Sequence, residues 1–472
     1  MDRGRRLRRS STAMTSQVRV ERDLIGTQDV PATVYWGVHT ARALQNFQIS
    51  GVAVGSHRPL VAALGAVKQA AVRANRDLGV LDGERATVID RACQEVIDGH
   101  LDGEFVVDVV QGGAGTSTNM NANEVIANRA LELLGYPRGS YDKLHPNDHV
   151  NRGQSTNDVY PTAVKLALIT ALGELAEAVG ALADAFGVKA EEFADVPKIG
   201  RTQLQDAVPM TVGQEFGAWR STVEEELARI AEARRLLCEI NLGATAIGTG
   251  ITSVIGYPHA AADHLREITG VPVVTATDLV EATSDTGSFL HLSATLRRTA
   301  VKVSKICNDL RLLSSGPQAG LGELRLPARQ AGSSIMPGKV NPVIPEMVNQ
   351  VAFAVIGNDL TVTLAAEGGQ LQLNAFEPII CHGLLQVMGW MSRAFDTLRT
   401  HCVDGIEVNR DHLQEISARS VSVVTALIPV LGYARASQVA AAVLDGRGGV
   451  RDLALATGSI AATDLDRLLG HG

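Results

Sequence analysis

The sequence predicts a protein built mainly from long α-helices that pack as a bundle. Two observations support this fold class: four long segments carry apolar residues at alternating spacings of three and four, and alternating strand patterns are sparse. An apolar stripe with a seven-residue repeat is typical of helices that pack along one another. Some of these segments exceed the usual length of a globular helix, which favours a bundle.

The stripes lie in the middle of the chain, and their residues are expected to fill the core. In chain order they are formed by Leu168, Leu172, Leu175, Val179, Leu182 and Phe186; by Phe216, Trp219, Val223, Leu227 and Ile230, continued by Leu237 and Ile240; by Leu292, Leu296, Val303, Ile306, Leu310 and Leu313; and by Leu384, Met388, Met391, Phe395, Leu398 and Cys402. A further helix is expected at 61–79 and a short strand at Val18–Val20, and Pro161 and Pro345 are placed in first helical turns.

The amino-acid composition limits the type of protein and the partners that are expected. The chain has 472 residues, 45% hydrophobic and 20% charged, as in soluble globular proteins, and its net charge of −8 argues against a general nucleic-acid partner. Five widely spaced cysteines indicate reduced, buried thiols and a cytoplasmic location. No apolar run looks long and uninterrupted enough to span a membrane.

The chain divides into regions by composition and helix length. Residues 1–17 form a basic tail that is expected to be disordered, although an Arg- and Ser-rich start is also typical of organelle-targeting peptides. Beyond it we expect an N-terminal domain at 18–154, a central helical-bundle domain at 155–405 and a small C-terminal helical domain at 406–472.

The segment Gly332–Pro342 combines glycines, two serines, a lysine and an asparagine, which suits a shaped loop that holds an anion and moves a proton. It is not a phosphate-binding P-loop. Five residues rather than four separate Gly332 from Gly338, and Val340 stands where that motif needs Ser or Thr after the lysine.

Three other clusters rich in hydroxyls and amides lie at Gln111–Asn121, Gln154–Asp158 and Gly200–Asp206. Each alone is explained equally well as a turn or a helix cap. Together with the loop they indicate one shared polar site. His145 and His149 have the spacing of a metal pair, but they lack a third ligand nearby, so a structural role is expected and no metal site is predicted.

The four clusters, in this order, resemble the aspartase/fumarase superfamily, and the match is close to its aspartate ammonia-lyase branch. The resemblance runs from about Val18 to the end of the chain. Branch assignment depends on His39, on Gln203 where fumarases carry histidine, and on the segments 342–346 and 365–374. One departure is Ile428, which stands where family members usually carry asparagine and makes the packing of the C-terminal region less certain.

The resemblance implies an all-α, three-domain fold whose central bundle assembles into a homotetramer with shared active sites. It implies reversible deamination of L-aspartate to fumarate and ammonia, with no cofactor; activation by a divalent cation is left open. A class II fumarate hydratase and a non-catalytic helical scaffold are the alternatives. No nucleic-acid or membrane partner is expected.

The resemblance also assigns roles to residues. Ser333 is the general base that removes the β-carbon proton, and the charge spreads into the β-carboxylate as an enediolate. Gly332 and Gly338 are the hinges of a closing loop. Thr116, Ser155, Thr156 and Ser334 contact the β-carboxylate, Asn157 holds the amino group, Thr202, Lys339 and Asn341 hold the α-carboxylate, and Gln203 and Glu346 are supporting residues.

Overall fold

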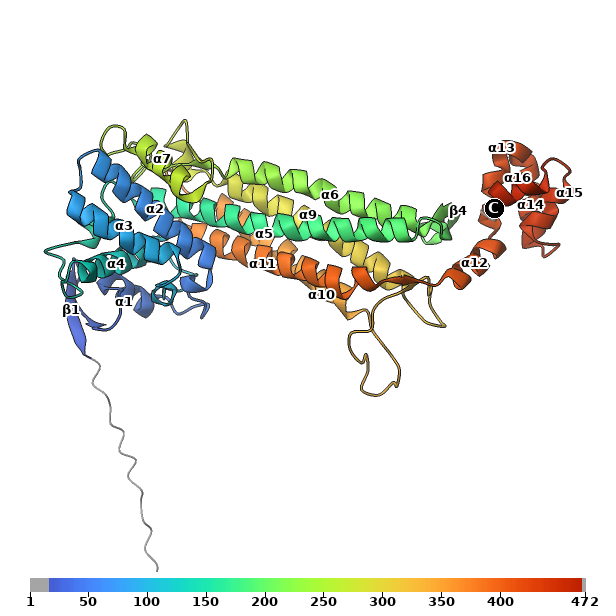
Figure 1. Cartoon of the computed structure of the whole chain (residues 1–472), viewed down its shortest axis with the longest axis horizontal. Coiled ribbons are helices and arrows are strands. Elements are labelled where there is room, and N and C mark those ends of the chain that lie inside the picture. Colours follow the sequence, from blue (N-terminus) through green and yellow to red (C-terminus); the bar gives the residue numbers. More distant parts are fainter. Residues whose placement is uncertain (1–16, 469–472) are drawn as a thin grey trace, which may run out of the picture. The chain divides into compact units, whose positions relative to one another are not determined.

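The structure, a computed structural model, describes residues 17–468 and is predominantly helical (Figure 1). Among these residues the strands form four two-stranded sheets, of which β5–β6 is parallel and the others antiparallel. The all-α fold class is therefore confirmed. The predicted basic tail lies outside the described residues except for Gln17.

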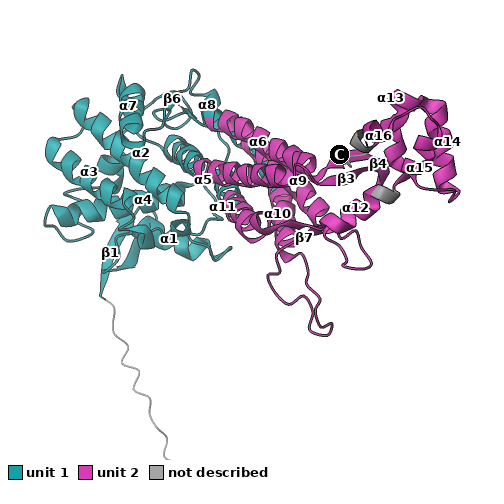
Figure 2. Ribbon diagram, turned by 45° about the vertical axis from the view of Figure 1, so that its right-hand side comes forward, with its two compact units in different colours: residues 1–170, 235–290, 361–385 teal, residues 171–234, 291–360, 386–472 magenta. Residues whose placement is uncertain are grey.

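The chain divides into two compact units. Unit 1 comprises residues 1–170, 235–290 and 361–385, and unit 2 comprises 171–234, 291–360 and 386–472 (Figure 2). Five long helices contribute residues to both units: α5 (Thr156–Glu192), α6 (Val212–Leu236), α9 (Gly287–Leu313), α10 (Val343–Glu367) and α11 (Glu377–His401). The three domains predicted from the sequence divide the chain differently, and that division stays a prediction.

Unit 1 is built around α2, which packs against α3 and α7, while α3 also packs against α4. Its remaining elements are short and lie around these helices. Besides the parts of the long helices, it contains β1 (Val18–Asp23), β2 (Gly26–Pro31), α1 (Val38–Asn46), η1 (Val54–Ser56), α2 (Arg58–Asp77), α3 (Gly83–Ile97), η2 (Asp102–Glu104), α4 (Thr116–Leu133), η3 (Pro146–Val150), β5 (Glu239–Ile240), α7 (Tyr257–Thr269), β6 (Val274–Thr275) and α8 (Glu281–Ser284).

Unit 2 contains most of the long bundle and the C-terminal helices. Phe186 of α5 packs against Phe216 and Trp219 of α6, with ring centroids 6.2 and 5.9 Å away. The last helices share a small core of their own, against which Ile428 packs. The other elements are β3 (Pro197–Thr202), β4 (Gln205–Thr211), β7 (Leu324–Arg325), η4 (Val403–Gly405), β8 (Glu407–Val408), α12 (Arg410–Arg419), η5 (Val421–Leu427), α13 (Ile428–Leu431), α14 (Tyr433–Leu444), α15 (Val450–Ala456) and α16 (Ala462–Leu468).

The four predicted stripes lie on α5, α6, α9 and α11. For α10 the sequence predicted a first helical turn at Pro345 but no apolar stripe. Its buried Val348, Ala352 and Val355 do follow a helical spacing. The opposite side is also apolar, with Phe353 64% and Leu360 60% exposed, so no polar face marks the stripe. The second stripe was extended too far, because α6 ends at Leu236 and Ile240 belongs to β5.

The positions of two prolines test the prediction of helix starts from local sequence. Pro345 lies in the first turn of α10, as predicted. Pro161 does not lie in a first turn: it is inside α5, five residues after the helix begins. Proline has no N–H to donate to the carbonyl four residues earlier, which belongs to Asn157. The side-chain amide of Asn241 donates to that carbonyl instead, at 3.0 Å, so the proline is tolerated.

All five cysteines are buried, which confirms the expectation of buried thiols. Burial raises the pKa of the Cys93 and Cys307 thiols well above its usual range. The expectation about apolar runs was wrong for α5, which contains an 18-residue window of mean hydropathy 1.7, long and apolar enough to cross a membrane. Half of that window is buried inside the protein.

Candidate active site

The predicted site residues form two sets, one in each unit. The first set consists of Thr116, Ser155, Thr156 and Asn157 at the N-termini of α4 and α5 in unit 1. Thr116 is the first residue of α4, and its hydroxyl donates to the carbonyl of Gly113 at 2.7 Å. Gly115 precedes it with φ +88°, and a Cβ there would lie 2.5 Å from the ring of Tyr160. Glycine is therefore required for α4 to begin here.

The start of α5 is a capping box. The hydroxyl of Ser155 accepts from the backbone N–H of Asn157 at 3.2 Å, and the N–H of Ser155 donates to the carboxylate of Asp158 at 3.0 Å. The N–H groups of a helix N-terminus attract anions. The hydroxyls of Ser155 and Thr156 therefore stand where a carboxylate is favoured.

Buried amides join the two helix starts. The Asn119 amide of α4 donates to the hydroxyl oxygen of Thr156 at 3.0 Å and, more weakly, to Asn151 at 3.3 Å. Because the Thr156 oxygen acts as an acceptor, its hydrogen is left to donate to a ligand. Behind them the fully buried Lys68 donates to Asn151 and Gln154, each at 2.9 Å. Burial lowers the pKa of Lys68 to about 7.

The sequence interpretation missed a segment that belongs to this set, Asn241–Gly250. Its Ala246 carbonyl accepts from the side-chain amide of Asn157 at 2.8 Å. Its Gly243 and Thr245 N–H groups donate to Asp158. Burial raises the pKa of Asp158 to about 7, while its three backbone N–H bonds and Lys68 act in the opposite direction. The signal was present, because the segment Asn-Leu-Gly-Ala-Thr-Ala-Ile-Gly-Thr-Gly has the same glycine and hydroxyl composition as the predicted clusters.

The second set lies in unit 2 and includes the predicted loop. The loop is closed at its neck: the Gly332 N–H donates to the Lys339 carbonyl at 2.8 Å, and the Asn341 amide donates to the Gly332 carbonyl at 2.9 Å. A Cβ at Gly332 would lie 2.7 Å from the Lys339 carbonyl oxygen. Gly332 thus permits a close approach of two backbone segments, and Gly338, with φ +82°, makes a left-handed turn.

Ser333 and Ser334 have different environments. The Ser333 hydroxyl is partly buried and accepts from the backbone N–H groups of Ile335 and Met336, at 3.2 and 3.0 Å. Such donors stabilise negative charge on the oxygen, as a serine base requires. Ser334 and Lys339 are exposed.

Thr202 and Gln203 lie at the tip of the β3–β4 hairpin. Thr202 pairs with Gln205, and Gln203 and Leu204, with φ +53° and +64°, form the two-residue turn. Buried Glu323 holds the hairpin by ion pairs with Lys198 at 2.9 Å and Arg201 at 2.5 Å. Arg201 thus braces the hairpin through Glu323.

Two cavities of unit 2 differ in charge. One of about 750 Å³ is lined by Lys339, Asn341 and Glu346, together with Arg311 and Arg325. Its three cations against one carboxylate suit an anionic ligand. Glu346 lies in the first turn of α10, where a helix N-terminus alone also favours it.

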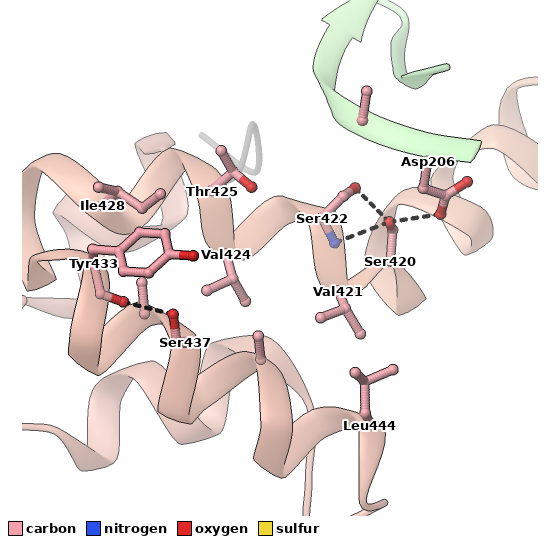
Figure 3. A pocket seen from close by; sticks show the side chains of 13 residues that line it. Asp206, Ser420, Val421, Ser422, Val424, Thr425, Ile428, Tyr433, Ser437 and Leu444 are labelled. Atoms are coloured by element: carbon pink, nitrogen blue, oxygen red, sulfur yellow. Dashed lines mark hydrogen bonds between the residues drawn. The ribbon is translucent and has the colours of Figure 1, made fainter. Parts of the chain in front are cut away.

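The other cavity, of about 600 Å³, lies between the hairpin and the C-terminal helices (Figure 3). Asp206 accepts from the Ser420 hydroxyl there at 3.1 Å. The described residues that line it include no lysine or arginine. It therefore does not suit a dicarboxylate.

His145 and His149 serve the local backbone. The Nδ1 of His149 accepts from the N–H of His145 at 2.8 Å, and the Nδ1 of His145 accepts from the N–H of Asn147 at 3.1 Å. These bonds fix the turn Pro146–Val150 and support the structural role predicted for the pair.

Comparison with known proteins identifies the class. A family model described as Lyase matches residues 26–357, and one described as Fumarase C C-terminus matches residues 423–471. The chain resembles the structure of a class II fumarase from Schistosoma mansoni with a TM-score of 0.90 and 34% identity, over 96% of this chain and 98% of that one. The fold is thus that of a lyase family, and the protein is an enzyme.

Two proteins with higher sequence identity to this chain assign it to one family within this class. The structure described as fumarate lyase:delta crystallin from Brucella melitensis bound to cobalt matches with a TM-score of 0.93 and 54% identity, over 96% of this chain and 98% of that one. An aspartate ammonia-lyase from Pseudomonas canavaninivorans is 54% identical over 452 residues, 96% of this chain and 95% of the relative. The chain therefore belongs to the aspartase/fumarase superfamily, and within it to the aspartate ammonia-lyase family.

Proposed function

We propose that the protein deaminates L-aspartate to fumarate and ammonia. The observation that carries this proposal is the 54% identity to an aspartate ammonia-lyase over almost the whole chain, against 34% to a class II fumarase. The site agrees with an amine-bearing substrate. With its Nδ2 donating to Ala246, Asn157 keeps its Oδ1 as an acceptor for an ammonium group.

In the proposed mechanism Ser333 acts as an alkoxide and takes the β-carbon proton. The electron pair of the broken C–H bond moves into the β-carboxylate, which becomes an enediolate with two negative charges. The N–H groups of Ile335 and Met336 support charge on the Ser333 oxygen before the transfer. The enediolate then collapses to form the double bond of fumarate, and the C–N bond breaks to release ammonia.

The remaining site residues are assigned to the parts of the substrate. Thr116, Ser155, Thr156 and Ser334 donate to the β-carboxylate, where charge develops. Thr116 has to rotate its hydroxyl away from Gly113 to do so. Lys339, Thr202 and Asn341 bind the α-carboxylate, and Gln203 and Glu346 support them. Because these side chains supply every group that the steps require, we propose that no cofactor takes part; assays with and without chelator and Mg²⁺ test activation by a cation.

We further propose that the enzyme works as a homotetramer whose active sites combine the two residue sets from different subunits. The exposed apolar stripe of α10, which includes Phe353, Ile356 and Leu360, supports burial against another copy of the chain. Light scattering combined with activity assays tests this: the active species should have the mass of a tetramer, and an active monomer contradicts it.

The decisive test of the reaction uses purified protein with L-aspartate and, separately, with L-malate. Ultraviolet absorbance follows the fumarate that forms. Fumarate from aspartate is expected. Fumarate from malate alone would identify a fumarate hydratase instead, and no fumarate from either would favour a scaffold without activity.

A further inference from the structure

The carboxylate of Asp158 joins two chain segments that are far apart in the sequence. One oxygen accepts from the N–H of Ser155 at 3.0 Å, and the other accepts from Gly243 and Thr245 at 3.1 and 2.8 Å. Asp158 is fully buried. Helix capping requires only the first of these bonds. The other two hold a segment that lies outside the helix.

That segment has a backbone conformation that costs free energy. Thr245 is β-branched and has φ +58°, which is an outlier for this residue type. Gly243 has φ +98°, and a Cβ there would lie 2.6 Å from Pro258. Such conformations persist where the surroundings impose them, and the two N–H bonds to Asp158 are part of that constraint.

The next residue of the segment, Ala246, fixes the orientation of Asn157. Its carbonyl oxygen can only accept, so the amide of Asn157 turns its NH₂ group toward Ala246 and leaves Oδ1 for another donor. This hydrogen bond needs both segments in register. Asp158 sets that register, since it binds the residue two before Asn157 and the residue just before Ala246.

We propose that Asp158 is a positioning residue for recognition of the substrate amino group, acting through Ala246 and Asn157. Its carboxylate clamps the Gly243–Ala246 backbone against the start of α5, so that the Asn157 oxygen is aimed at an ammonium group. The inference rests on the proposed deamination, in which Asn157 holds the amino group.

The reverse reaction provides the test, because its two substrates use different parts of the site. Asp158→Asn replaces one acceptor oxygen by an NH₂ group. In either orientation of the amide, one of the two segments faces a second donor, which loosens the register that the Asn157–Ala246 bond needs. We expect the KM for ammonium to rise about tenfold, as for the loss of one oriented bond to a charged group, while the KM for fumarate changes by less than about twofold.

Glu124→Gln is the matched control. Glu124 is also fully buried in unit 1, and it accepts from the N–H groups of Gly37, His39 and Thr40 at 2.8 to 3.1 Å. This variant should lower the melting temperature and leave both KM values unchanged. A double variant with Asn157→Ala sharpens the test. If Asp158 acts through Asn157, the double variant has the same KM for ammonium as Asn157→Ala alone.

Equal changes in both KM values, or no change in either, would overturn the proposal and leave Asp158 as a structural cap. If Asp158→Asn does not fold, Asp158→Ala removes the clamp without introducing an opposing donor, and the same split between the KM values is expected. Failure of the proposed function is a different result, because the unaltered enzyme would then not combine ammonium with fumarate.

Discussion

The two residue sets of the candidate site differ in how far buried side chains support them by hydrogen bonds. In unit 1 the hydroxyls stand on helix N-termini. The buried Asn119 donates to the Thr156 hydroxyl, and the buried Asp158 accepts from the backbone N–H of Ser155. The buried Lys68 donates to the side chain of Gln154, the residue before Ser155. In unit 2 the loop bonds mainly to itself at its neck, and Ile335 and Met336 at its tip are 84% and 48% exposed.

This difference indicates a division of labour. Donors fixed by a buried network stabilise developing charge without having to reorganise during the reaction. A segment with few buried contacts opens at low cost, which suits a loop that admits the substrate and then completes the site. We therefore expect substitutions in the unit 1 set to change both activity and stability, and substitutions in the loop to change activity alone.

The largest effect is expected for Ser333→Ala. Loss of the base should lower kcat by about a thousandfold, the middle of the range for a general base. The melting temperature should stay unchanged, because the Ser333 oxygen accepts only two N–H bonds in a largely exposed loop. Fumarate absorbance measures the rate, and thermal unfolding checks the fold. Near-normal turnover would remove Ser333 from the mechanism.

Lys339→Met comes next. Loss of the cation should lower kcat/KM for aspartate about a hundredfold or more, as for truncation of one partner of a desolvated charge pair, and the KM should rise. Lys143→Met is the control, because Lys143 is exposed in unit 1 and pairs only with its neighbour Asp142. If both variants show the same modest loss, Lys339 contributes only general charge.

Thr156→Val and Ser334→Ala test the comparison directly. Each removes one donor to the β-carboxylate, so each should lower kcat/KM by about 10- to 100-fold. Thr156→Val also leaves the Asn119 amide with only its weaker bond to Asn151, and the melting temperature should fall by a few degrees. Ser334 is exposed, so its variant should melt like the unaltered protein. Equal melting temperatures would mean that the buried network does not stabilise the unit 1 set.

Local features of the sequence were enough to predict most of the bundle and to locate the polar clusters, whereas their assembly into one active site stays a prediction. Helical stripes and Gly/Ser/Asn clusters are short-range signals, and they appear in the structure on α5, α6, α9 and α11 and in the loops before α4, α5 and α10. The order of these clusters also carried the family resemblance. The ends of helices were predicted less accurately. Pro161 lies inside α5, and Leu237 lies beyond the end of α6, because helix ends depend on tertiary contacts that local sequence rules do not include.

The features that were missed depend on residues distant in the chain. Lys68 is a lysine in a helix with no local sign of burial, yet it is fully buried and donates to Asn151 and Gln154, 83 and 86 residues away. The Asn157–Ala246 bond spans 89 residues. The stripe of α10 was missed for another reason: its apolar residues occupy both sides of the helix, which removes the contrast between an apolar and a polar face.

The smallest effect on activity is expected at His57 of unit 1, whose Nε2 bonds to Nδ1 of His382 at 2.8 Å. Burial, followed by the charge of His382, lowers the pKa of His57 from 6.5 to about 4. In the unfolded chain His57 therefore binds a proton near pH 6.5, whereas in the folded protein it binds this proton only near pH 4. The free energy of unfolding should be highest above pH 6.5 and fall by up to about 3 kcal/mol as the pH drops through this window.

His57→Gln keeps a donor for His382 and cannot take up a proton, so the decline between pH 6.5 and 4 should become shallower by that amount. Urea unfolding at pH 7 and 4 measures it, with the exposed His100→Gln as the control. An unchanged slope would show that other groups set the acid sensitivity of unit 1. A shallower slope with unchanged kcat at pH 7 would separate the stability of the unit from the chemistry of its residue set.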